Sequence, residues 1–501
     1  MIPKRLSKSK VLSAQQCKKK LWLELNQSGF AQDDSSSEKN IRIGNRLGEL
    51  AQSIYDPLGE GTVIDPFGTS FDNALETTAQ LLSDDSPIFE AAFATDFGFV
   101  LADIMHRHSE ADNWQMVEIK SSSSIKDYHL ADIAIQNYVT SQAGVKLEKI
   151  SIGHIDSTWI YKGDSDYRGL IKEADLTNVI EPMLDIVPNW FSSAQETARS
   201  DIEPDIPVGK HCKSPYSCPF IEYCSKNLPQ AAYPVDWLPR ISKHDLKDYI
   251  HDNDVIEIAD VPDNLLNEKQ LRVKHATLSG QTYFDLVGAS SVLNKYDYPY
   301  RFLDFETISP AIPIWAETRP FQQLPFQYSL HIEREHGAEL EHFEFLDISG
   351  KDPTLRFATK LIEDCGSQGP IFVYNISFEA SRLRDLADRY PKHKAALLSI
   401  KERMVDLWPI AKDYYYNPSQ QGSWSIKKVL PAVAPHLDYD QLDGVKDGGM
   451  AMDAFEEAIS NSAEKKRKET LKQQLLKYCE LDTIAMVELL YFFKTGENYK
   501  K

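Results

Sequence analysis

Three of the six cysteines lie close together in the sequence, and they place a strong constraint on how the N-terminal half can fold. Cys212, Cys218 and Cys224 are separated from one another by five residues, in a segment that contains prolines. Structural zinc sites usually use tighter Cys-x2–4-Cys pairs, which this segment lacks. Three thiolates need a fourth ligand, and Cys17, near the start of the chain, is the candidate. A shared site would hold residue 17 beside residues 212–224.

Thiolate-rich sites suit iron–sulphur clusters and zinc alike. We expect an iron–sulphur cluster; the alternatives are zinc held together with His211 or Cys17, and thiols without any ligand. Cys365 and Cys479 lie in expected helices of the C-terminal half. We expect these two thiols to be small, buried, apolar side chains.

The composition is that of a globular protein, with 42% hydrophobic and 26% charged residues in 501, a length that suits roughly three domains. No segment approaches the roughly 20 apolar residues that cross a bilayer. The start, MIPKRLSKSK, is basic, but the polar sequence SAQQCKKK follows where a signal peptide would carry its apolar core. We therefore expect a cytoplasmic protein without a membrane partner, in which the cysteines form no disulfide framework.

The formal net charge of −20 is unusual for a protein that binds nucleic acid, because phosphate contacts use Lys and Arg. Binding requires only a local basic patch, however, and a metal-dependent nuclease also uses carboxylates as metal ligands. Seven cations near the N-terminus form either a solvated helix face or a track for phosphates. They are Lys4, Arg5, Lys8, Lys10, Lys18, Lys19 and Lys20.

The pattern of apolar residues predicts an α/β protein in three parts: an α/β unit over residues 1–227, a charged helical connector over 228–299, and a unit of strands and helices over 300–501. In the first part we expect helices within 13–82, 127–143 and 176–198, and strands at 88–95, 98–108, 114–122 and 148–156. In the last part we expect three successive strands at 300–307, 325–333 and 340–347, then a helix at 354–365, a strand at 370–375 and helices at 377–390 and 463–493.

A first carboxylate site is expected on two neighbouring strands of the N-terminal part. Asp103 follows the apolar run GFVLA, and Glu118 and Lys120 stand at i and i+2 of the next strand, so their side chains share one face. A hairpin between the strands would bring Asp103 beside them. Two carboxylates can hold Mg²⁺ or Mn²⁺, and an ammonium can stabilise the charge that develops in phosphodiester hydrolysis. The alternative is an exposed strand face of mixed charge.

The residues that follow this strand resemble the PD-(D/E)XK nuclease superfamily, in particular its RecB-like branch. After Glu118-Ile-Lys-Ser-Ser come Tyr128, His129, Asp132, Gln136 and Tyr138 on an expected helix. The resemblance implies that Asp103 and Glu118 bind metal and that Lys120 is catalytic. It also implies that Gln136 and Tyr138, on the helix, position the active site and the DNA.

The sequence departs from the RecB-like pattern at one place. These enzymes usually supply a metal-binding histidine from an early helix, where this sequence has Gly48. Either Glu49 substitutes for the histidine, or the site holds its metal less tightly. Glu90 stands where the branch often has another acidic residue.

The cysteine layout resembles the RecB-like nucleases with an iron–sulphur cluster, which include the CRISPR adaptation exonucleases and AddB-type subunits. In those proteins one early and three late cysteines clamp a 4Fe–4S cluster that closes the nuclease domain. The resemblance implies the same role for Cys17, Cys212, Cys218 and Cys224.

A second carboxylate site is expected in the C-terminal part, built from three separate segments. Asp304 and Glu306 stand at i and i+2 of a strand, and Glu379 lies in the first turn of a helix. Tyr478 and Asp482 stand at i and i+4 of the last helix, on one face. Four such acids can form a two-metal site with ions about 3.5–4 Å apart, which stabilises the attacking and leaving oxygens.

These three segments resemble the motifs of the DEDD exonucleases, in the RNase H-like superfamily that includes the DnaQ proofreading group. The resemblance implies that Asp304, Glu306, Glu379 and Asp482 are metal ligands and that Tyr478 orients the attacking water. Glu379 departs from the usual Asp, and its extra methylene would move one ligand by about an ångström. Without the resemblance, Tyr478 is a packed helix aromatic and Asn375, before the second motif, caps the following helix.

The order of the elements resembles a family of largely uncharacterised bacterial nucleases that join a RecB-like domain to an RNase H-like domain of the DEDDy type. The resemblance implies a metal-dependent DNA nuclease that trims single-stranded ends or flaps in DNA repair or phage defence. Two alternatives stay open: an RNA-processing exonuclease, and a nucleic-acid-binding scaffold in which one or both sites are inactive.

Overall fold

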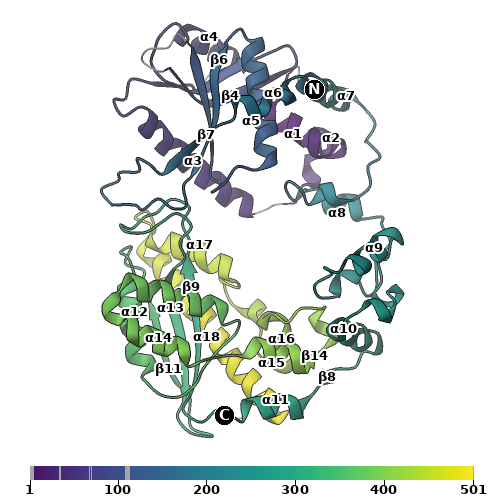
Figure 1. Ribbon diagram of the computed structural model, residues 1–501, viewed down its shortest axis with the longest axis vertical. Helices are drawn as coiled ribbons and strands as arrows, with labels where there is room; N and C mark the ends of the chain where they lie inside the picture. The colour runs from purple at the N-terminus through teal and green to yellow at the C-terminus, as the bar shows by residue number, and fades with distance from the viewer. Residues whose placement is uncertain (1–4, 33–34, 67, 69, 108–112, 500–501) are drawn as a thin grey trace. The chain divides into compact units, whose positions relative to one another are not determined.

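The structure is a computed structural model in which residues 5–32, 35–66, 68, 70–107 and 113–499 are described. The protein is a mixed α/β protein of two compact units (Figure 1). Unit 1 comprises Met1–Leu228 with Pro310–Phe321, and unit 2 comprises Pro229–Ser309 with Gln322–Lys501. Among the described residues, no helix is both long and apolar enough to cross a membrane.

Unit 1 is built on a seven-stranded sheet. Its strand order is β2 (Thr62–Val63), β3 (Ile88–Ala94), β4 (Gly98–Arg107), β5 (Trp114–Lys120), β6 (Leu147–Ile155) and β7 (Ile171–Asp175), and β1 (Leu6–Ser7) pairs with β4. Strands β3, β4 and β5 are antiparallel, whereas β5 and β6 are parallel. Parallel neighbours require a crossover, and α5 (Asp127–Gln142) provides it. Apolar residues of α5 such as Ile133 and Val139 are fully buried in the core of this unit.

Among its described residues, the region expected to hold helices before residue 82 contains four α-helices. They are α1 (Lys8–Gln16), α2 (Lys18–Asn26), α3 (Ser35–Tyr55) and α4 (Phe71–Leu81). Cys17 separates α1 from α2 because its backbone is extended, with φ −166° and ψ 121°. This break leaves the cysteine at the junction of two helices.

The single helix expected over residues 176–198 is instead two, α6 (Thr177–Leu184) and α7 (Val187–Arg199). Pro188 lies in the first turn of α7. Proline has no N–H to donate to the preceding turn, so it suits a helix start and disfavours a continuous helix. The prediction missed this break.

Unit 2 contains a five-stranded sheet in the order β11 (Glu341–Leu346), β10 (Leu324–Glu333), β9 (Tyr300–Ile308), β12 (Ile371–Val373) and β13 (Met404–Asp406). The first three strands are the predicted antiparallel meander, and β12 and β13 continue it in parallel. The helices α12 (Thr354–Cys365), α13 (Ser377–Arg389) and α14 (Lys394–Glu402) pack on one face. The other face is covered by α18 (Lys465–Thr495) and α17 (Gly448–Ile459), and α15 (Leu407–Tyr414) and α16 (Ile426–Val433) pack against α18 (Figure 1).

Strand β9 shows how the alternation of side chains divides these two faces. Leu303 and Phe305 are buried in the core with α12 and α13. Tyr300 and Phe302 are buried with residues of α18 on the opposite face. Asp304 and Glu306 continue that second series, because side chains at i and i+2 share a face. The strand therefore directs both carboxylates toward α18.

The segment expected as a separate connector is part of unit 2. It forms α9 (His244–Asp252), α10 (Glu268–Ser279) and α11 (Leu286–Leu293), and Val235, Ile258 and Val273 are buried in one cluster with α15 and α18. Conversely, Pro310–Phe321, within the expected 300–501 part, belongs to unit 1. There Tyr161 forms an isolated β-bridge with Thr318. A contact between residues so far apart in the sequence leaves no periodic signal.

Candidate metal sites

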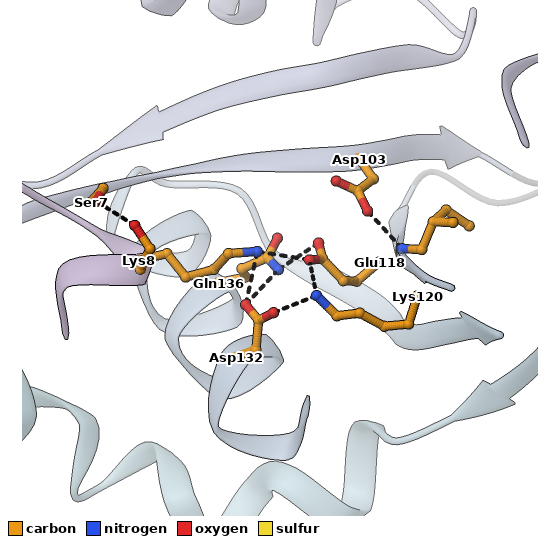
Figure 2. A network of polar contacts seen from close by, with 9 residues as sticks. Ser7, Lys8, Asp103, Glu118, Lys120, Asp132 and Gln136 are labelled. Atoms are coloured by element: carbon orange, nitrogen blue, oxygen red, sulfur yellow. Dashed lines mark hydrogen bonds and ion pairs between the residues drawn. The ribbon is translucent and has the colours of Figure 1, made fainter. Parts of the chain in front are cut away.

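The first carboxylate site lies on β4, β5 and α5 of unit 1 (Figure 2). β4 and β5 form the expected antiparallel pair, with Ile104 opposite Val117. Asp103 on β4 accepts a hydrogen bond at Oδ2 from the backbone N–H of Ile119, at 2.7 Å. The pairing therefore places Asp103 next to the segment that carries Glu118 and Lys120.

Glu118 and Lys120 point to the same face of β5, as their spacing predicts. The Lys120 Nζ donates to Glu118 Oε1 at 2.6 Å and to Asp132 Oδ2 at 2.5 Å. Gln136, one turn after Asp132 on α5, donates from Nε2 to Glu118 Oε2 at 2.6 Å. Glu118 is 3% exposed and Gln136 is fully buried, so these contacts fix the carboxylate in one orientation.

Lys8 is a member of this network that the sequence did not single out. As the first residue of α1, it donates from Nζ to Glu118 Oε1 at 2.7 Å and lies 2.8 Å from Asp132 Oδ1. In the same basic run, Lys10 contacts Glu24 and Lys19 contacts Glu203. These three lysines are engaged in ion pairs inside unit 1, so neither a solvated face nor an open phosphate track describes them. Lys4 lies outside the described residues.

Asp103 and Asp132, two of the carboxylates near these lysines, have pKa values shifted in opposite directions. Burial raises the pKa of Asp103 well above its usual value, and the charge of Glu118 adds to this, while Lys8 and Lys120 oppose it. Burial also acts to raise the pKa of Asp132, but the contacts with Lys8 and Lys120 outweigh it and hold that pKa below its ordinary value. Asp132 thus keeps its charge and Asp103 retains a proton more readily.

Glu90 on β3 lies close to this network. Burial raises its pKa, the charge of Glu118 raises it further, and Lys8 lowers it. Its φ of 57° lies in the left-handed region, which non-glycine residues adopt rarely and often at functional sites.

Two other expected residues lie elsewhere. Tyr138 is half-buried, with its ring 6.0 Å from that of Phe191, so it packs in the core of unit 1. Glu49 is exposed and contacts Arg46 at 2.9 Å. Neither residue joins the polar network of Figure 2 among the side chains described. The contact with Arg46 therefore gives no support to Glu49 as a substitute for the missing histidine.

The four expected cysteine ligands line one small cavity in unit 1. Cys17 comes from the α1–α2 junction, Cys212 from a 3-10 turn, Cys218 from the following loop and Cys224 from α8 (Ile221–Ser225). Burial raises the pKa of Cys218, with smaller contributions from Cys212 and Cys17 and opposition from Lys20. His211 lines the same cavity. Among the described residues, no three ligand atoms of these five side chains lie within 4.8 Å of one another, the proximity that a single zinc ion would need. A wider spacing suits a four-thiolate cluster, in which different cysteines bind different irons.

The second carboxylate site lies in unit 2 between β9 and α18. One oxygen from each of Asp304, Glu306 and Asp482 can be chosen so that all lie within 4.8 Å of one another. Tyr478 is buried one helical turn before Asp482. The predicted pairs at i and i+2 on the strand and at i and i+4 on the helix therefore meet.

Glu379, in the first turn of α13, is 2% exposed and its Oε2 has no hydrogen-bond partner among the described residues. Burial raises its pKa to about 8, and the charges of Asp406 and Asp482 contribute. Burial likewise raises the pKa of Asp482 to about 6, against hydrogen bonds from Tyr439 and Tyr478 and the charge of Lys427.

Burial also shifts the pKa values of Asp304 and Glu306, the two carboxylates on β9. Burial raises the pKa of Asp304 and of Glu306 well above their usual values, and Asp482 is the next largest contributor to both. Several buried carboxylates in one place either bind protons or bind cations, because their mutual repulsion is otherwise uncompensated. The oxygens of Asp304, Glu306 and Asp482 fit a hard divalent cation such as Mg²⁺ or Mn²⁺, whereas Glu379 lies outside the group of oxygens within 4.8 Å of one another.

Two residues that the sequence did not identify complete this site. The Tyr439 hydroxyl donates to Asp482 Oδ1 at 2.5 Å. Lys427 Nζ lies 5.2 Å from the ring centre of Tyr439 and 5.1 Å from that of Tyr478. Both come from segments without a motif, and only the tertiary structure brings them to α18. Cys365 and Cys479 are fully buried, as predicted.

Comparison with known proteins gives similarity without an assigned activity. A family model described as a domain of unknown function (DUF2779) matches residues 301–425, which include Asp304, Glu306 and Glu379 but not Asp482. An uncharacterized protein of Mycoplasma genitalium is 27% identical over 220 residues, which are 40% of this chain and 33% of the relative. Its Mycoplasma pneumoniae homologue is 26% identical over 223 residues, 41% of this chain and 33% of the relative. An uncharacterized protein of Ureaplasma parvum is 25% identical over 249 residues, which are 44% of this chain and 36% of the relative. The matched region spans about a third of the length of these relatives.

Proposed function

We propose that the chain is a metal-dependent nuclease that hydrolyses phosphodiester bonds at the carboxylate site of unit 2. The observation that carries the proposal is the convergence of Asp304, Glu306 and Asp482 within 4.8 Å, from a strand and a helix far apart in the sequence. Glu379 is the fourth acid: it lies outside that group of three, but it is buried, has one oxygen without a hydrogen-bond partner among the described residues, and its charge raises the pKa of Asp304 and of Glu306. Four acids of this kind fit a divalent metal. The proposal assigns unit 2 an RNase H-like exonuclease architecture of the DEDDy type.

Each residue of the unit 2 site has a defined part in such a reaction. Asp304, Glu306, Glu379 and Asp482 would hold Mg²⁺ or Mn²⁺. When bound, such an ion polarises the phosphate and lowers the pKa of water. Tyr439 holds the carboxylate of Asp482 in place through its 2.5 Å hydrogen bond. Tyr478 keeps its proton at neutral pH, because burial raises its pKa, and its hydroxyl can therefore orient an attacking water.

We extend the proposal to unit 1, as a second nuclease site of the PD-(D/E)XK type. Asp103 and Glu118 would hold the metal, and Lys120 would stabilise charge on the phosphate. Gln136 orients Glu118, and Asp132 keeps the Lys120 ammonium within the site, at 2.6 Å and 2.5 Å respectively. The polar network supports this assignment, because the buried Glu118 carboxylate and both lysines belong to one set of contacts.

The four cysteines would hold a 4Fe–4S cluster that closes unit 1, and Cys17 would tie the start of the chain to Cys212, Cys218 and Cys224. The substrate we propose is DNA with single-stranded ends or flaps, in DNA repair or phage defence. RNA is the alternative substrate, because the same four-carboxylate chemistry cleaves both nucleic acids.

The test is hydrolysis of matched end-labelled DNA and RNA oligonucleotides and flapped duplexes by the full chain in Mn²⁺ or Mg²⁺. We expect cleavage of single-stranded DNA or flaps that a chelator abolishes. Asp304→Asn should reduce the hydrolysis rate of unit 2 at least about a hundredfold, because the proposed metal loses a charged ligand and stabilises the transition state less well. Glu402→Gln, an exposed acid on α14, is the matched control. If no substrate is cleaved in either metal while oligonucleotides still bind, the protein is a scaffold and the proposal is wrong.

A further inference from the structure

A cavity of about 930 Å³ opens in unit 2, beside the segment that carries Glu379. Its lining includes Arg240, Lys269, Tyr374, Trp408, Lys412 and Trp424. The size falls in the range of about 300–1,000 Å³ that is usual for ligand-binding clefts. The lining combines cations with aromatic rings, which is the chemistry that binds single-stranded nucleic acid.

The cations of this cavity are close enough to repel one another. Burial lowers the pKa of Lys412, and the charges of Lys269 and Arg240 lower it further. Lys269 is paired with Asp413 at 2.6 Å, on a partly exposed surface. Glu268 also lines the cavity, but the three cations outnumber it, so the wall is locally basic in a chain of net charge −20. An anion in the cavity would relieve their repulsion.

Two of the three aromatic side chains of the cavity are held in place by hydrogen bonds. The Tyr374 hydroxyl donates to the backbone carbonyl of Trp424 at 2.6 Å, and the Trp424 indole donates to the carbonyl of Tyr415 at 2.8 Å. Trp408 is half-buried, with Lys412 Nζ 4.3 Å from its ring centre. A ring fixed at the wall of a cavity offers a stacking surface without first losing conformational freedom.

The cavity adjoins the carboxylate site through one short segment of chain. Tyr374 and Asn375, directly after β12, line the cavity. Asp406 accepts hydrogen bonds from the backbone N–H of Asn375 at 2.9 Å and of Ile376 at 3.2 Å. Glu379 follows in the first turn of α13. The segment that bounds the cavity thus also positions a proposed metal ligand.

We propose that this cavity binds the single strand of nucleic acid whose end enters the unit 2 carboxylate site, with phosphates on Arg240, Lys269 and Lys412 and a base on Trp408. This inference rests on the proposed function and specifies where its substrate is held. No residue of the cavity wall other than the 374–375 segment belongs to the sequence motifs of the carboxylate site.

The test separates binding from cleavage. Fluorescence anisotropy with a labelled oligonucleotide is measured in a chelator with Asp304→Asn protein, so that hydrolysis does not occur. Lys412→Ala should weaken binding about five- to tenfold and reduce the slope of log affinity against log salt by about one. Trp408→Ala should weaken binding at least about fivefold, as the loss of one stacked base does. Lys392→Ala, an exposed cation after α13, is the control and should bind as Asp304→Asn does.

Arg240→Ala guards against misfolding, because Arg240 is exposed and its side chain supports no core. It should weaken binding about as much as Lys412→Ala. If all three variants bind like the control, the cavity does not hold the strand. Unlabelled competitors then distinguish a strand from a small anion. If a homopolymer displaces the labelled oligonucleotide while a mononucleotide and pyrophosphate do not, the inference stands. If pyrophosphate binds and the homopolymer does not, the cavity is a small-anion site and the inference fails. Tight binding without any cleavage in Mn²⁺ would overturn the proposed function alone.

Discussion

At the scale of single residues, Glu379 is the carboxylate whose surroundings most clearly require a bound proton or cation. It is buried, one of its oxygens lacks a hydrogen-bond partner among the described residues, and burial raises its pKa to about 8. A carboxylate in this state is stabilised by a proton or by a metal ion. The longer side chain, which departs from the usual Asp of the resembled family, thus lies where either a proton or a cation would stabilise it.

If the site is built around the longer side chain, Glu379→Asp should impair hydrolysis by roughly tenfold or more. A shorter ligand leaves a gap in a rigid shell, and Mg²⁺ tolerates irregular geometry poorly. Mn²⁺ should therefore rescue the variant better than Mg²⁺ does. Turnover numbers in both metals check this. Turnover well above that of the unaltered chain would instead identify Glu379 as a degenerate substitution, and unchanged cleavage by Glu379→Ala would exclude it as a ligand.

The raised pKa of Glu379 also predicts how stability depends on pH. Burial raises its pKa from the ordinary 4.5 to about 8, so the folded state binds the proton more tightly than the unfolded state does. The stabilisation is complete below about 4.5 and is lost as pH rises through about 8. Metal-free protein should melt at a lower temperature at pH 8.5 than at pH 6, and Mn²⁺ should raise the melting temperature more at pH 8.5. Glu379→Gln should flatten this dependence; an unchanged pH profile in that variant would contradict the assignment.

Residues that share a local spacing could be predicted, and residues that meet only through tertiary folding could not. Asp304 with Glu306, and Tyr478 with Asp482, follow from the periods of strand and helix. Lys8 reaches Glu118 across 110 residues, and Tyr439 reaches Asp482 across 43, without any periodic signal. Tyr138 shows the converse, because its position beside Gln136 suggested a functional role and the structure packs it on Phe191.

At the scale of elements, the segment before β9 shows what local patterns leave undecided. Its helices were predicted, but their polar composition suggested a separate connector. The segment packs instead into unit 2, where its few apolar residues join the cluster of α15 and α18. Strands and helices after residue 300 were predicted more closely, because their apolar runs are long and strictly periodic.

Gly422 lies directly against the backbone of this segment. Its φ is 78°, and a Cβ there would lie 1.7 Å from the carbonyl oxygen of Trp237. Gly422→Ala should therefore lower the stability of unit 2 by at least about 2–3 kcal/mol, through overpacking and backbone strain. Gly280→Ala is the matched control, because Gly280 has φ 69° and nothing within 4 Å of the added atom. It should cost about 1 kcal/mol. Thermal unfolding of both variants checks this, and equal losses would contradict the close approach.

At the scale of the whole molecule, each unit carries its own carboxylate site, and the two should be separable. Lys120→Ala should abolish one cleavage mode and leave another, and Asp304→Asn should do the reverse. Product patterns from substrates labelled at either end distinguish the two modes. If Lys120→Ala removes all hydrolysis in every metal, unit 2 is a binding module.

The cysteine cavity should determine whether unit 1 folds. Anaerobically purified protein should contain about four irons per chain and absorb broadly near ~400 nm. Cys218→Ala should lose the iron and reduce solubility, because cluster ligation contributes to folding. Cys365→Ala, in the core of unit 2, is the control that should keep its iron. Stoichiometric zinc without iron would show that the cavity is a zinc site.

The chain passes between the two units three times, at residues 228–229, 309–310 and 321–322. A gene fragment that begins at residue 229 would therefore encode Ala311 without Leu47, Leu50, Ile155 and Leu170, the side chains that bury it. Tyr161 and Tyr167, which hydrogen-bond to residues 313–318, would be missing as well. No single cut in the chain therefore leaves each unit with all of its own residues. Recombination at one point of the gene would transfer both units together or leave one of them incomplete.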